Sequence, residues 1–303
     1  MHWHILGAGA IGCLWAGILS RAGQDVTLIL RNRHTLDQWP TPGRLDILQA
    51  GTCHSVDCHL ETLAADTTIT HLLVATKAYD TLSAIEAIQP RLSPDAEVVL
   101  LQNGMGQQQA VHAYLPTHPL WAATTTAGAW REARHRVHCV SLGDTHIGAL
   151  SAATSYLPAG WADMDIPLQH CTDIYPHLWR KLAINCAINP LTALFDCHNG
   201  KLLTHPERKQ KMYAACHEVE RVAAAAGITL FSTSLTDQAT TVATATAANV
   251  SSMLADVRHQ RRTEIEQITG FLCQQAQALG IEVPVNRSLL QQIRALGPNE
   301  GAH

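Results

Sequence analysis

Three glycines near the N-terminus constrain the fold more strongly than any other feature of this chain. They form the pattern G-x-G-x-x-G between a short apolar strand over residues 2–6 and an apolar helix over residues 13–22. In a Rossmann βαβ unit the first glycine permits a tight turn, the second lets the backbone approach a pyrophosphate, and the third lets helix and strand pack closely. This order of elements predicts a dinucleotide site. The residues expected to line it are Gly7, Gly9, Ala10, Ile11 and Gly12.

The second predicted strand, over residues 25–30, ends at an arginine instead of an acidic residue. Enzymes that prefer NAD usually place Asp or Glu there, where the carboxylate binds the 2′-hydroxyl of the ribose. Arg31 occupies this place here, and Arg33 follows closely. Because a guanidinium pairs bidentately with a phosphate, the sequence predicts NADPH as the cofactor. The alternative is that Arg31 is a solvent-exposed charge at the end of a strand.

The charge of the chain limits its partners. The formal net charge of −4 is mild and argues against nucleic acid or an anionic membrane. The uncharged segment over residues 5–20 is shorter than the roughly 20 residues that a membrane span needs, and it is rich in glycine. We therefore expect a cytoplasmic protein with a small-molecule substrate, either a monomer or a homodimer.

Neither the cysteines nor the histidines form a ligand pattern. The nine cysteines are scattered without a C-x-x-C pair, which favours reduced thiols buried as small apolar residues. The 18 histidines include no H-E-x-x-H motif and no zinc-like spacing with cysteine. The sequence therefore predicts no structural or catalytic metal.

The apolar patterns predict two domains of different class in the 303 residues. In the first half, near-continuous apolar strands alternate with helices such as residues 81–88, as in a parallel sheet that is buried on both faces. The further strands expected here cover residues 69–75, 97–101, 120–126, 136–140 and 145–150. This half is predicted to be a Rossmann-type, doubly wound α/β domain over residues 1–170.

Helical patterns dominate the second half, with prolines at helix starts and glycines at helix ends. The expected helices cover residues 174–193, 207–226, 235–259, 263–279 and 285–296. We therefore predict an all-α C-terminal domain over residues 171–303, with an active site in the cleft between the two domains.

The helix expected over residues 174–193 carries the most informative polar residues of the helical half. Lys181, Asn185 and Asn189 recur every four residues on an otherwise apolar helix, so they lie on one stripe. A lysine on a buried helix is costly unless it is paired or lines a polar cavity. The alternative is that Lys181 extends its charge to solvent at the end of the helix.

A second polar stripe follows further along the chain. If one helix runs through this region, five polar residues face one way. These are Asn249, Ser252, Asp256, Gln260 and Glu264. A lysine and a glutamate that face a nicotinamide can reduce a carbonyl, with the lysine donating to the ketone oxygen and the glutamate holding the lysine in place. The alternative is a solvated helix face, since several arginines lie nearby.

Taken together, these motifs resemble the ketopantoate reductase (2-dehydropantoate 2-reductase) family. The resemblance covers nearly the whole chain in the right order, and its most specific blocks surround Lys181 and Ser252. The matching segments are residues 6–12, 30–31, 76–78, 102–106, 178–190, 199–200, 249–256 and 263–265. The resemblance implies an NADPH-dependent oxidoreductase of pantothenate and coenzyme A biosynthesis, with a Rossmann domain followed by a helical domain.

The resemblance also implies a role for each matching residue. It implies Lys181 as the catalytic lysine and Glu264 as the active-site glutamate. Hydride would pass to the keto carbon of ketopantoate while Lys181 neutralises the developing alkoxide. The residues that would hold substrate are Asn103, Lys181, Asn185, Asn189, Asn199, Asn249 and Ser252. Outside the glycine loop, the residues that would bind NADPH are Arg31, Lys77 and Asn103.

Two other functions remain open on the sequence. A reductase of another 2-keto or 3-hydroxy acid would keep the glycines and Lys181 but change the asparagines. A non-catalytic NADPH-binding sensor would keep the glycines and Arg31 and could lose Lys181 and Glu264. All of these residues are present, which favours ketopantoate reduction. The chain departs from the family pattern at Asp196-Cys-His, and residues 151–173 have no clear match.

Overall fold

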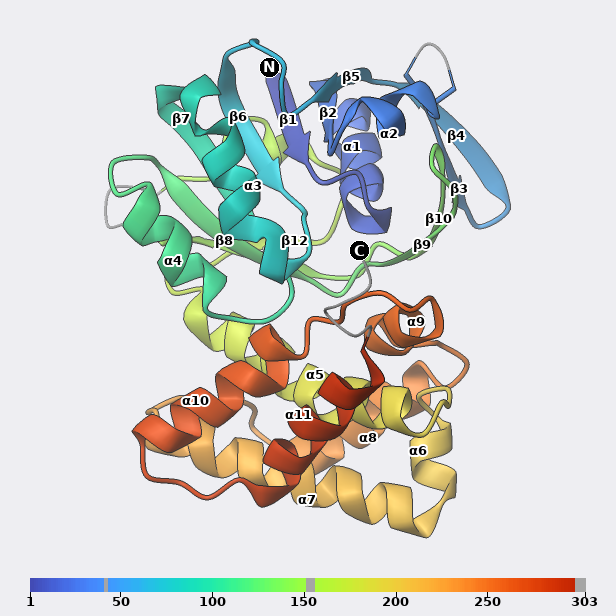
Figure 1. The fold of residues 1–303 in the computed structure, drawn as a ribbon, viewed down its shortest axis with the longest axis vertical. Helices are drawn as coiled ribbons and strands as arrows, with labels where there is room; N and C mark the ends of the chain where they lie inside the picture. The colour runs from blue at the N-terminus through green and yellow to red at the C-terminus, as the bar shows by residue number, and fades with distance from the viewer. Residues whose placement is uncertain (41–42, 151–155, 298–303) are drawn as a thin grey trace. The chain divides into compact units, whose positions relative to one another are not determined.

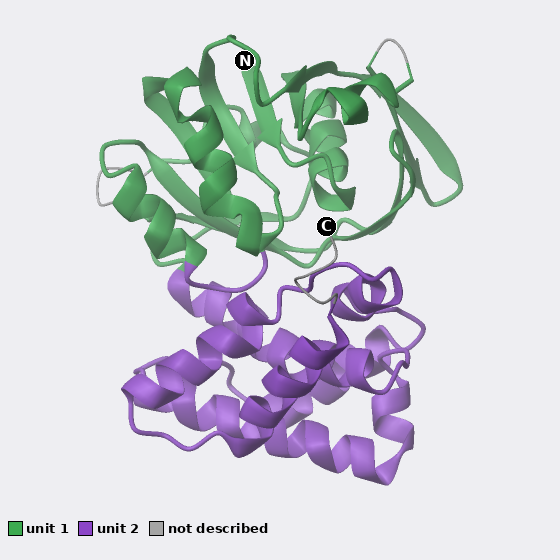
Figure 2. Ribbon diagram, viewed as in Figure 1, with its two compact units in different colours: residues 1–102, 107–174 green, residues 103–106, 175–303 purple. Residues whose placement is uncertain are grey.

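The computed structural model describes residues 1–40, 43–150 and 156–297. The chain divides into two compact units. The first contains residues 1–102 and 107–174, and the second contains residues 103–106 and 175–303 (Figure 2). Residues 151–155, which begin the stretch without a family match, lie outside the described residues.

The first unit is built on an eight-stranded sheet of order β12-β11-β8-β7-β6-β1-β2-β5 (Figure 1). Its strands are β1 (His2–Leu6), β2 (Asp25–Leu30), β5 (His59–Thr62), β6 (Ile69–Val74), β7 (Leu92–Leu100), β8 (Leu120–Thr125), β11 (Thr145–Ala149) and β12 (Leu168–His170). Strands β8 and β11 pair antiparallel, and the other neighbouring pairs are parallel. The strand that leads into the glycines, β1, lies between β2 and β6, so the predicted Rossmann-type sheet is confirmed.

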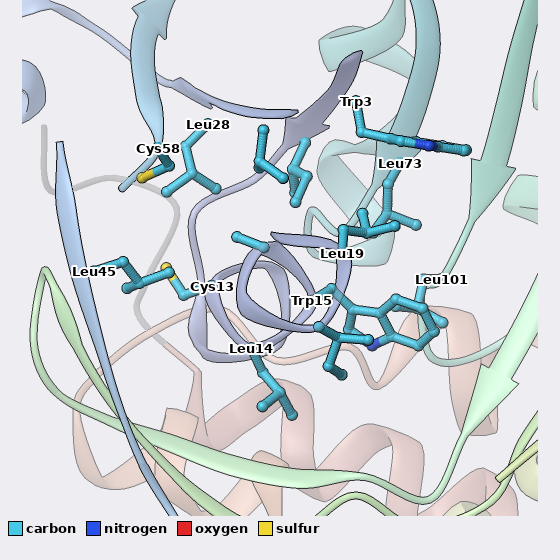
Figure 3. Close-up of a cluster of buried hydrophobic side chains, with 14 of the residues drawn as sticks. Trp3, Cys13, Leu14, Trp15, Leu19, Leu28, Leu45, Cys58, Leu73 and Leu101 are labelled. Atoms are coloured by element: carbon cyan, nitrogen blue, oxygen red, sulfur yellow. The ribbon is translucent and has the colours of Figure 1, made fainter. Parts of the chain in front are cut away.

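Helices cover both faces of this sheet because its central strands are apolar on both sides. On one face, α1 (Ala10–Arg21) packs Leu14, Trp15 and Leu19 into a cluster with Trp3 and Leu28 of the strands (Figure 3). The opposite face carries a second apolar cluster, to which α3 (Thr81–Ile88) and α4 (Gln107–Tyr114) contribute. The glycine-containing turn between β1 and α1 is thereby held between a buried strand and a buried helix.

The sequence did not predict a second, four-stranded sheet in this unit. Its order is β4-β3-β10-β9, with β3 (Arg44–Gln49), β4 (Thr52–Asp57), β9 (Gly128–Ala133) and β10 (Arg136–Ser141). The strand expected over residues 136–140 is β10, but it pairs with β3 and β9 instead of joining the main sheet. Most of β4 is exposed, so its sequence shows none of the apolar alternation that predicts a strand. Helix α1 contacts β3, β9 and β10 on its other side.

The second unit is helical, as predicted, and α5 (Tyr175–Leu194) lies at its centre. The helices that contact α5 are α6 (Lys201–Thr204), α7 (Pro206–Ala225), α8 (Leu235–Ala245), α9 (Ser252–Arg258) and α11 (Pro284–Leu296). Thirteen of the twenty residues of α5 are buried. A polar side chain on this helix is therefore surrounded by protein along most of the helix surface.

The helix expected over residues 235–259 is two helices, so this prediction was wrong. Helix α8 ends at Ala245, and α9 begins at Ser252. Ser251 caps α9, because its hydroxyl accepts a hydrogen bond from the Leu254 N–H at 3.1 Å. Serine favours helix caps, and this cap starts a new helix at a place where apolar spacing alone predicts that the first one continues.

The helix expected over residues 263–279 also differs from the structure. Helix α10 (Phe271–Ala278) is preceded by a π-helical turn, η4 (Glu266–Gly270). The Gly270 N–H donates to the Ile265 carbonyl oxygen at 2.9 Å, which is the five-residue bond of a π-helix. Such turns are rare and occur frequently at functional sites. This one begins two residues after Glu264.

Within the described ranges, no helix is both long and apolar enough to cross a membrane. In the same part of the chain, no group of three or more His, Cys, Asp or Glu side chains could hold a metal ion. The nine cysteines are free thiols, and most of them are buried.

A buried carboxylate fixes the start of the last helix. Glu218 of α7 is 4% exposed. Its oxygens accept hydrogen bonds from the backbone N–H groups of Val285 and Asn286 and from the side-chain amide of Asn286, each at 2.8 Å. These backbone groups lie in the first turn of α11, where a helix offers no partners of its own. Glu218 therefore supplies acceptors that the helix cannot.

We predict that Glu218→Ala lowers the free energy of unfolding by about 3 kcal/mol, because it leaves buried donors without their charged acceptor. Urea denaturation followed by circular dichroism measures the loss. Glu282→Ala removes an exposed carboxylate near the same helix and should change stability by less than about 0.5 kcal/mol. A loss below about 1 kcal/mol in Glu218→Ala would contradict this structural role.

Candidate active site

The glycine loop has the close packing that a dinucleotide fingerprint requires. Gly7 has a φ of +108°, and a Cβ built on it would lie 2.8 Å from the backbone of Ala75 and Thr76. A Cβ on Gly12 would lie 1.9 Å from the carbonyl oxygen of Gly7. Both positions therefore require glycine, the first for its backbone conformation and the second for the approach of α1 to the turn.

Gly9 differs from the other two glycines because the space above it is open. A Cβ on Gly9 would meet nothing within 4 Å. Gly9 is also the N-cap of α1, where no side chain caps the helix and no acidic residue lies in the first turn. The first N–H groups of a helix and its dipole favour an anion. The start of α1, with Ala10 and Ile11, is therefore available to a phosphate.

Arg31 lies directly after β2, where the sequence predicts a phosphate-binding arginine. Its side chain is 74% exposed, and its Nη2 donates to Oδ2 of Asp80 at 3.0 Å. Asp80 belongs to the short helix η1 (Ala78–Asp80) in the loop after β6, and Lys77 immediately precedes η1. The structure thus brings Arg31 and the loop of Lys77 together, although the sequence did not predict a carboxylate beside the arginine.

One residue at the glycine loop escaped the sequence analysis altogether. Arg131 of β9 donates from Nη1 to the carbonyl oxygen of Ala8 at 2.7 Å. The bond ties the second sheet to the loop between Gly7 and Gly9. The two partners lie 123 positions apart. No local pattern predicts such a contact, since it depends on a sheet that the sequence did not reveal.

In the second unit, the polar stripe of α5 is partly enclosed by protein. Asn185 and Asn189 are each 8% exposed, and Lys181 is partly buried. Burial lowers the pKa of Lys181 to about 8, and the negative charge of Glu264 opposes this by raising it. Lys181 is therefore an amine that can gain or lose a proton close to neutral pH, as expected of a group that exchanges protons in an active site.

Glu264 and Asn103 lie next to each other, although they are distant in sequence. Glu264 is 5% exposed, and Nδ2 of Asn103 lies 3.5 Å from its Oε2. The Met105 N–H donates to the Gln267 carbonyl oxygen of η4 at 2.9 Å, which holds the loop of Asn103 in place. Gly104 has a φ of +77°, and a Cβ on it would lie 2.5 Å from the same carbonyl oxygen. Only glycine permits this approach.

Asn199 and Asn249 are brought together by the connection between α8 and α9. The Asn199 N–H donates to the Asn249 carbonyl oxygen at 3.1 Å, and its Nδ2 donates to Oγ1 of Thr246 at 2.9 Å. Asn199 is 8% exposed, whereas Asn249 is exposed. The side chain of Asn199 therefore bonds within the protein and holds the connection that carries Asn249.

Ser252 and its neighbour have different surroundings at the start of α9. Ser251 is buried, and its hydroxyl lies 2.7 Å from Oγ1 of Thr192 on α5. Ser252 is exposed, so its hydroxyl is not used to fix the helix. The sequence analysis named Ser252 alone, and the structure shows that its neighbour Ser251 is the residue that caps the helix.

A single polar face from Asn249 to Glu264 required one helix to run through this region, and the structure does not meet this condition. Helix α9 ends at Arg258, and Gln260 has a φ of +53°. Asp256 is 2% exposed and accepts a hydrogen bond from Nε of Arg261 at 3.0 Å, which closes the turn after α9. Glu264 thus reaches the neighbourhood of α5 through a turn and not along a helix.

Known proteins match both halves of the chain. Residues 3–152 match the family described as Ketopantoate reductase PanE/ApbA, and residues 173–297 match Ketopantoate reductase PanE/ApbA C terminal. A 2-dehydropantoate 2-reductase from Vibrio cholerae is 37% identical over 296 residues, which cover 96% of each chain. The 2-dehydropantoate 2-reductase of Escherichia coli O157:H7 is 35% identical over 296 residues, or 96% of this chain and 93% of that one.

Solved structures share the fold. A PanE/ApbA family ketopantoate reductase from Ralstonia eutropha JMP134 has a TM-score of 0.88 at 28% identity, with 98% of each chain covered. A ternary structure of D-mandelate dehydrogenase with NADH and anilino(oxo)acetate has a TM-score of 0.90 at 21% identity, which shows the fold alone. The Rossmann-type unit, the helical unit and these relatives define an oxidoreductase. The chain belongs to the ketopantoate reductase family.

The lowered pKa of Lys181 predicts a pH dependence of stability. The unfolded chain keeps the ordinary lysine pKa of 10.5, so between about pH 8 and 10.5 it binds more protons than the folded chain. Stability therefore rises with pH in this window because of Lys181. Relative to Lys181→Met, which does not titrate, the wild type should gain up to about 3 kcal/mol across the window.

Urea denaturation of both proteins at each pH measures this difference. Lys201→Met removes an exposed lysine and is the matched control, relative to which the wild type should show no gain in the same window. A wild-type curve that stays parallel to the Lys181→Met curve from pH 8 to 10.5 would show that folding leaves the pKa of Lys181 unchanged.

Proposed function

We propose that this chain reduces the keto group of 2-dehydropantoate (ketopantoate) to give pantoate, with NADPH as the reductant. The observation that carries the proposal is the cluster of Lys181, Glu264 and Asn103 in a chain that is 37% identical to a 2-dehydropantoate 2-reductase. A titratable amine beside a buried carboxylate suits a ketone oxygen that gains negative charge. The reaction belongs to pantothenate and coenzyme A biosynthesis.

The residues of the first unit fit a dinucleotide that carries an extra phosphate. The open space over Gly9, the uncapped start of α1 and the exposed guanidinium of Arg31 supply donors and positive charge. We assign the pyrophosphate to Gly9, Ala10 and Ile11, the 2′-phosphate to Arg31, and the neighbouring ribose to Lys77. When bound, NADPH would supply the hydride.

Lys181 is assigned to the ketone oxygen. With a pKa of about 8, it is mostly protonated at neutral pH and can donate a hydrogen bond or a proton as charge develops on the oxygen. The carboxylate of Glu264 favours the protonated amine and so keeps the proton available. The carboxamide of Asn103 lies 3.5 Å from that carboxylate and restricts its position.

The substrate is assigned to the remaining polar residues of the same unit. Asn185 and Asn189 present carboxamides from one face of α5, four and eight positions after Lys181. Together with Asn249 and Ser252 they would hold the carboxylate and the hydroxyl of ketopantoate and orient its keto carbon. In this assignment Asn199 contributes by holding the connection that carries Asn249.

The direct test of the reaction is the oxidation of NADPH with ketopantoate, set beside pyruvate and other 2-keto acids. We expect kcat/KM for ketopantoate to exceed the others by at least about tenfold, or 1.4 kcal/mol. A higher kcat/KM with another 2-keto acid would identify that acid as the substrate instead of ketopantoate. Binding of NADPH without oxidation in the presence of any 2-keto acid would favour a non-catalytic sensor.

Lys181→Ala should lower kcat by about 10²- to 10⁴-fold, because the lysine acts where charge develops in the transition state. NADPH binding, measured by fluorescence titration, should stay near the wild-type value. Glu264→Ala should also lower kcat, and the double variant should be little worse than the worse single variant, because the two groups act as a unit. Near-normal kcat in Lys181→Ala would reject the assignment.

Arg31→Ala should reduce kcat/KM for NADPH while leaving kcat/KM for NADH almost unchanged, because only NADPH carries the 2′-phosphate. The wild type should prefer NADPH by at least about tenfold. Arg33→Ala is the matched control, since Arg33 pairs with Asp37 at 3.0 Å within one short helix and should not affect the preference. Equal efficiency of the wild type with both cofactors would contradict this role of Arg31.

A further inference from the structure

We propose that Asp80 moderates the cofactor preference of this chain. Its carboxylate partly neutralises Arg31, repels the 2′-phosphate of NADPH and can accept a hydrogen bond from the ribose 2′-hydroxyl of NADH. The proposal rests on the proposed binding of NADPH at Arg31. It concerns a residue 49 positions away from the arginine, for which neither the glycine loop nor the second strand gives any indication.

Arg31 and Asp80 meet because of the strand order of the main sheet. Arg31 follows β2, and Asp80 lies in η1 after β6. Strands β2 and β6 flank β1 and run parallel to it. The carboxyl ends of all three strands therefore lie at one edge of the sheet, where ligands bind in this class of fold. The topology thus places the carboxylate of Asp80 beside Arg31, which the local sequence around the arginine does not indicate.

The side chain of Asp80 bonds Arg31 and does not cap its own helix. Asp80 is the N-cap residue of α3, a position at which aspartate commonly accepts a hydrogen bond from a helix N–H group. Its side chain makes no capping bond and instead accepts Nη2 of Arg31 at 3.0 Å. The two side chains remain 74% and 37% exposed, so an incoming ligand can reach them.

A nearby ion pair provides a comparison within the same protein. Nε of Arg33 donates to Oδ1 of Asp37 at 3.0 Å inside α2 (Arg33–Asp37). That pair has the four-residue spacing of a helix and needs no other explanation. The pair of Arg31 and Asp80 instead joins two loops. Asp37 therefore serves as a control that has the same charge and a similar distance to its arginine.

The two members of the pair favour different cofactors. An arginine that is paired with a carboxylate presents less positive charge to a phosphate, and the carboxylate itself repels the phosphate. NADH lacks this phosphate, and in NAD-preferring Rossmann domains an acidic side chain after the second strand, where Arg31 stands here, binds its ribose 2′-hydroxyl. The carboxylate of Asp80 lies 3.0 Å from the guanidinium of Arg31 and can accept from the same hydroxyl. Arg31 thus favours NADPH and Asp80 favours NADH, so removal of the charge of Asp80 should sharpen the preference for NADPH.

The test measures Kd for NADP⁺ and NAD⁺ by isothermal titration calorimetry at low ionic strength. The ratio of Kd for NAD⁺ to Kd for NADP⁺ should rise roughly two- to fivefold in Asp80→Asn, the range expected for one exposed ion pair. It should stay near the wild-type value in Asp80→Glu, which keeps the charge, and in Asp37→Asn. The rise should shrink at about 1 M salt because the charges are exposed.

An unchanged or lower ratio in Asp80→Asn would overturn the proposal, as would an equal rise in Asp80→Glu or in Asp37→Asn. The measurement requires no turnover and is therefore separate from the test of the reaction. A wild type that fails to reduce ketopantoate would reject the proposed reaction without changing these ratios. A wild type that binds neither dinucleotide would overturn both proposals.

Discussion

The ammonium group of Lys181 is the constraint on which the second unit depends. A charge inside apolar surroundings costs several kcal/mol unless it is paired, and α5 is buried along most of its length. The carboxylate of Glu264 offsets part of this cost, and the pKa of Lys181 settles at about 8. The chain reaches Glu264 through a turn closed by Asp256, and the π-helical turn η4 that follows packs against α5.

The candidate binding groups of the two units come from different parts of the chain. In the first unit the groups available to a phosphate are backbone N–H groups at the start of α1 and the side chain of Arg31. In the second unit the candidate groups are side chains of α5 and of the segments that pack on it. Glycine makes both arrangements possible, since Gly7 and Gly104 adopt positive φ angles and permit backbone contacts that a Cβ would prevent.

The parts of the fold that depend on local sequence could be predicted. The glycine loop and α5 are examples, because apolar spacing and glycine positions act within a few turns of chain. The second sheet could not be predicted, since β4 is exposed and gains its partners from distant strands. The contact of Arg131 with Ala8 and the pair of Arg31 with Asp80 are also non-local. The break between α8 and α9 was missed because apolar spacing continued across a serine cap.

The most direct test of the account is the titration of Lys181 itself. The chain has five lysines, so their ¹³Cε signals can be followed by NMR after isotope labelling, and Lys181→Arg assigns the signal. The wild type should titrate near pH 8 at this position, and Glu264→Gln should titrate lower because the carboxylate that raises the pKa is gone. A midpoint near the ordinary value of 10.5 in both proteins would contradict the account.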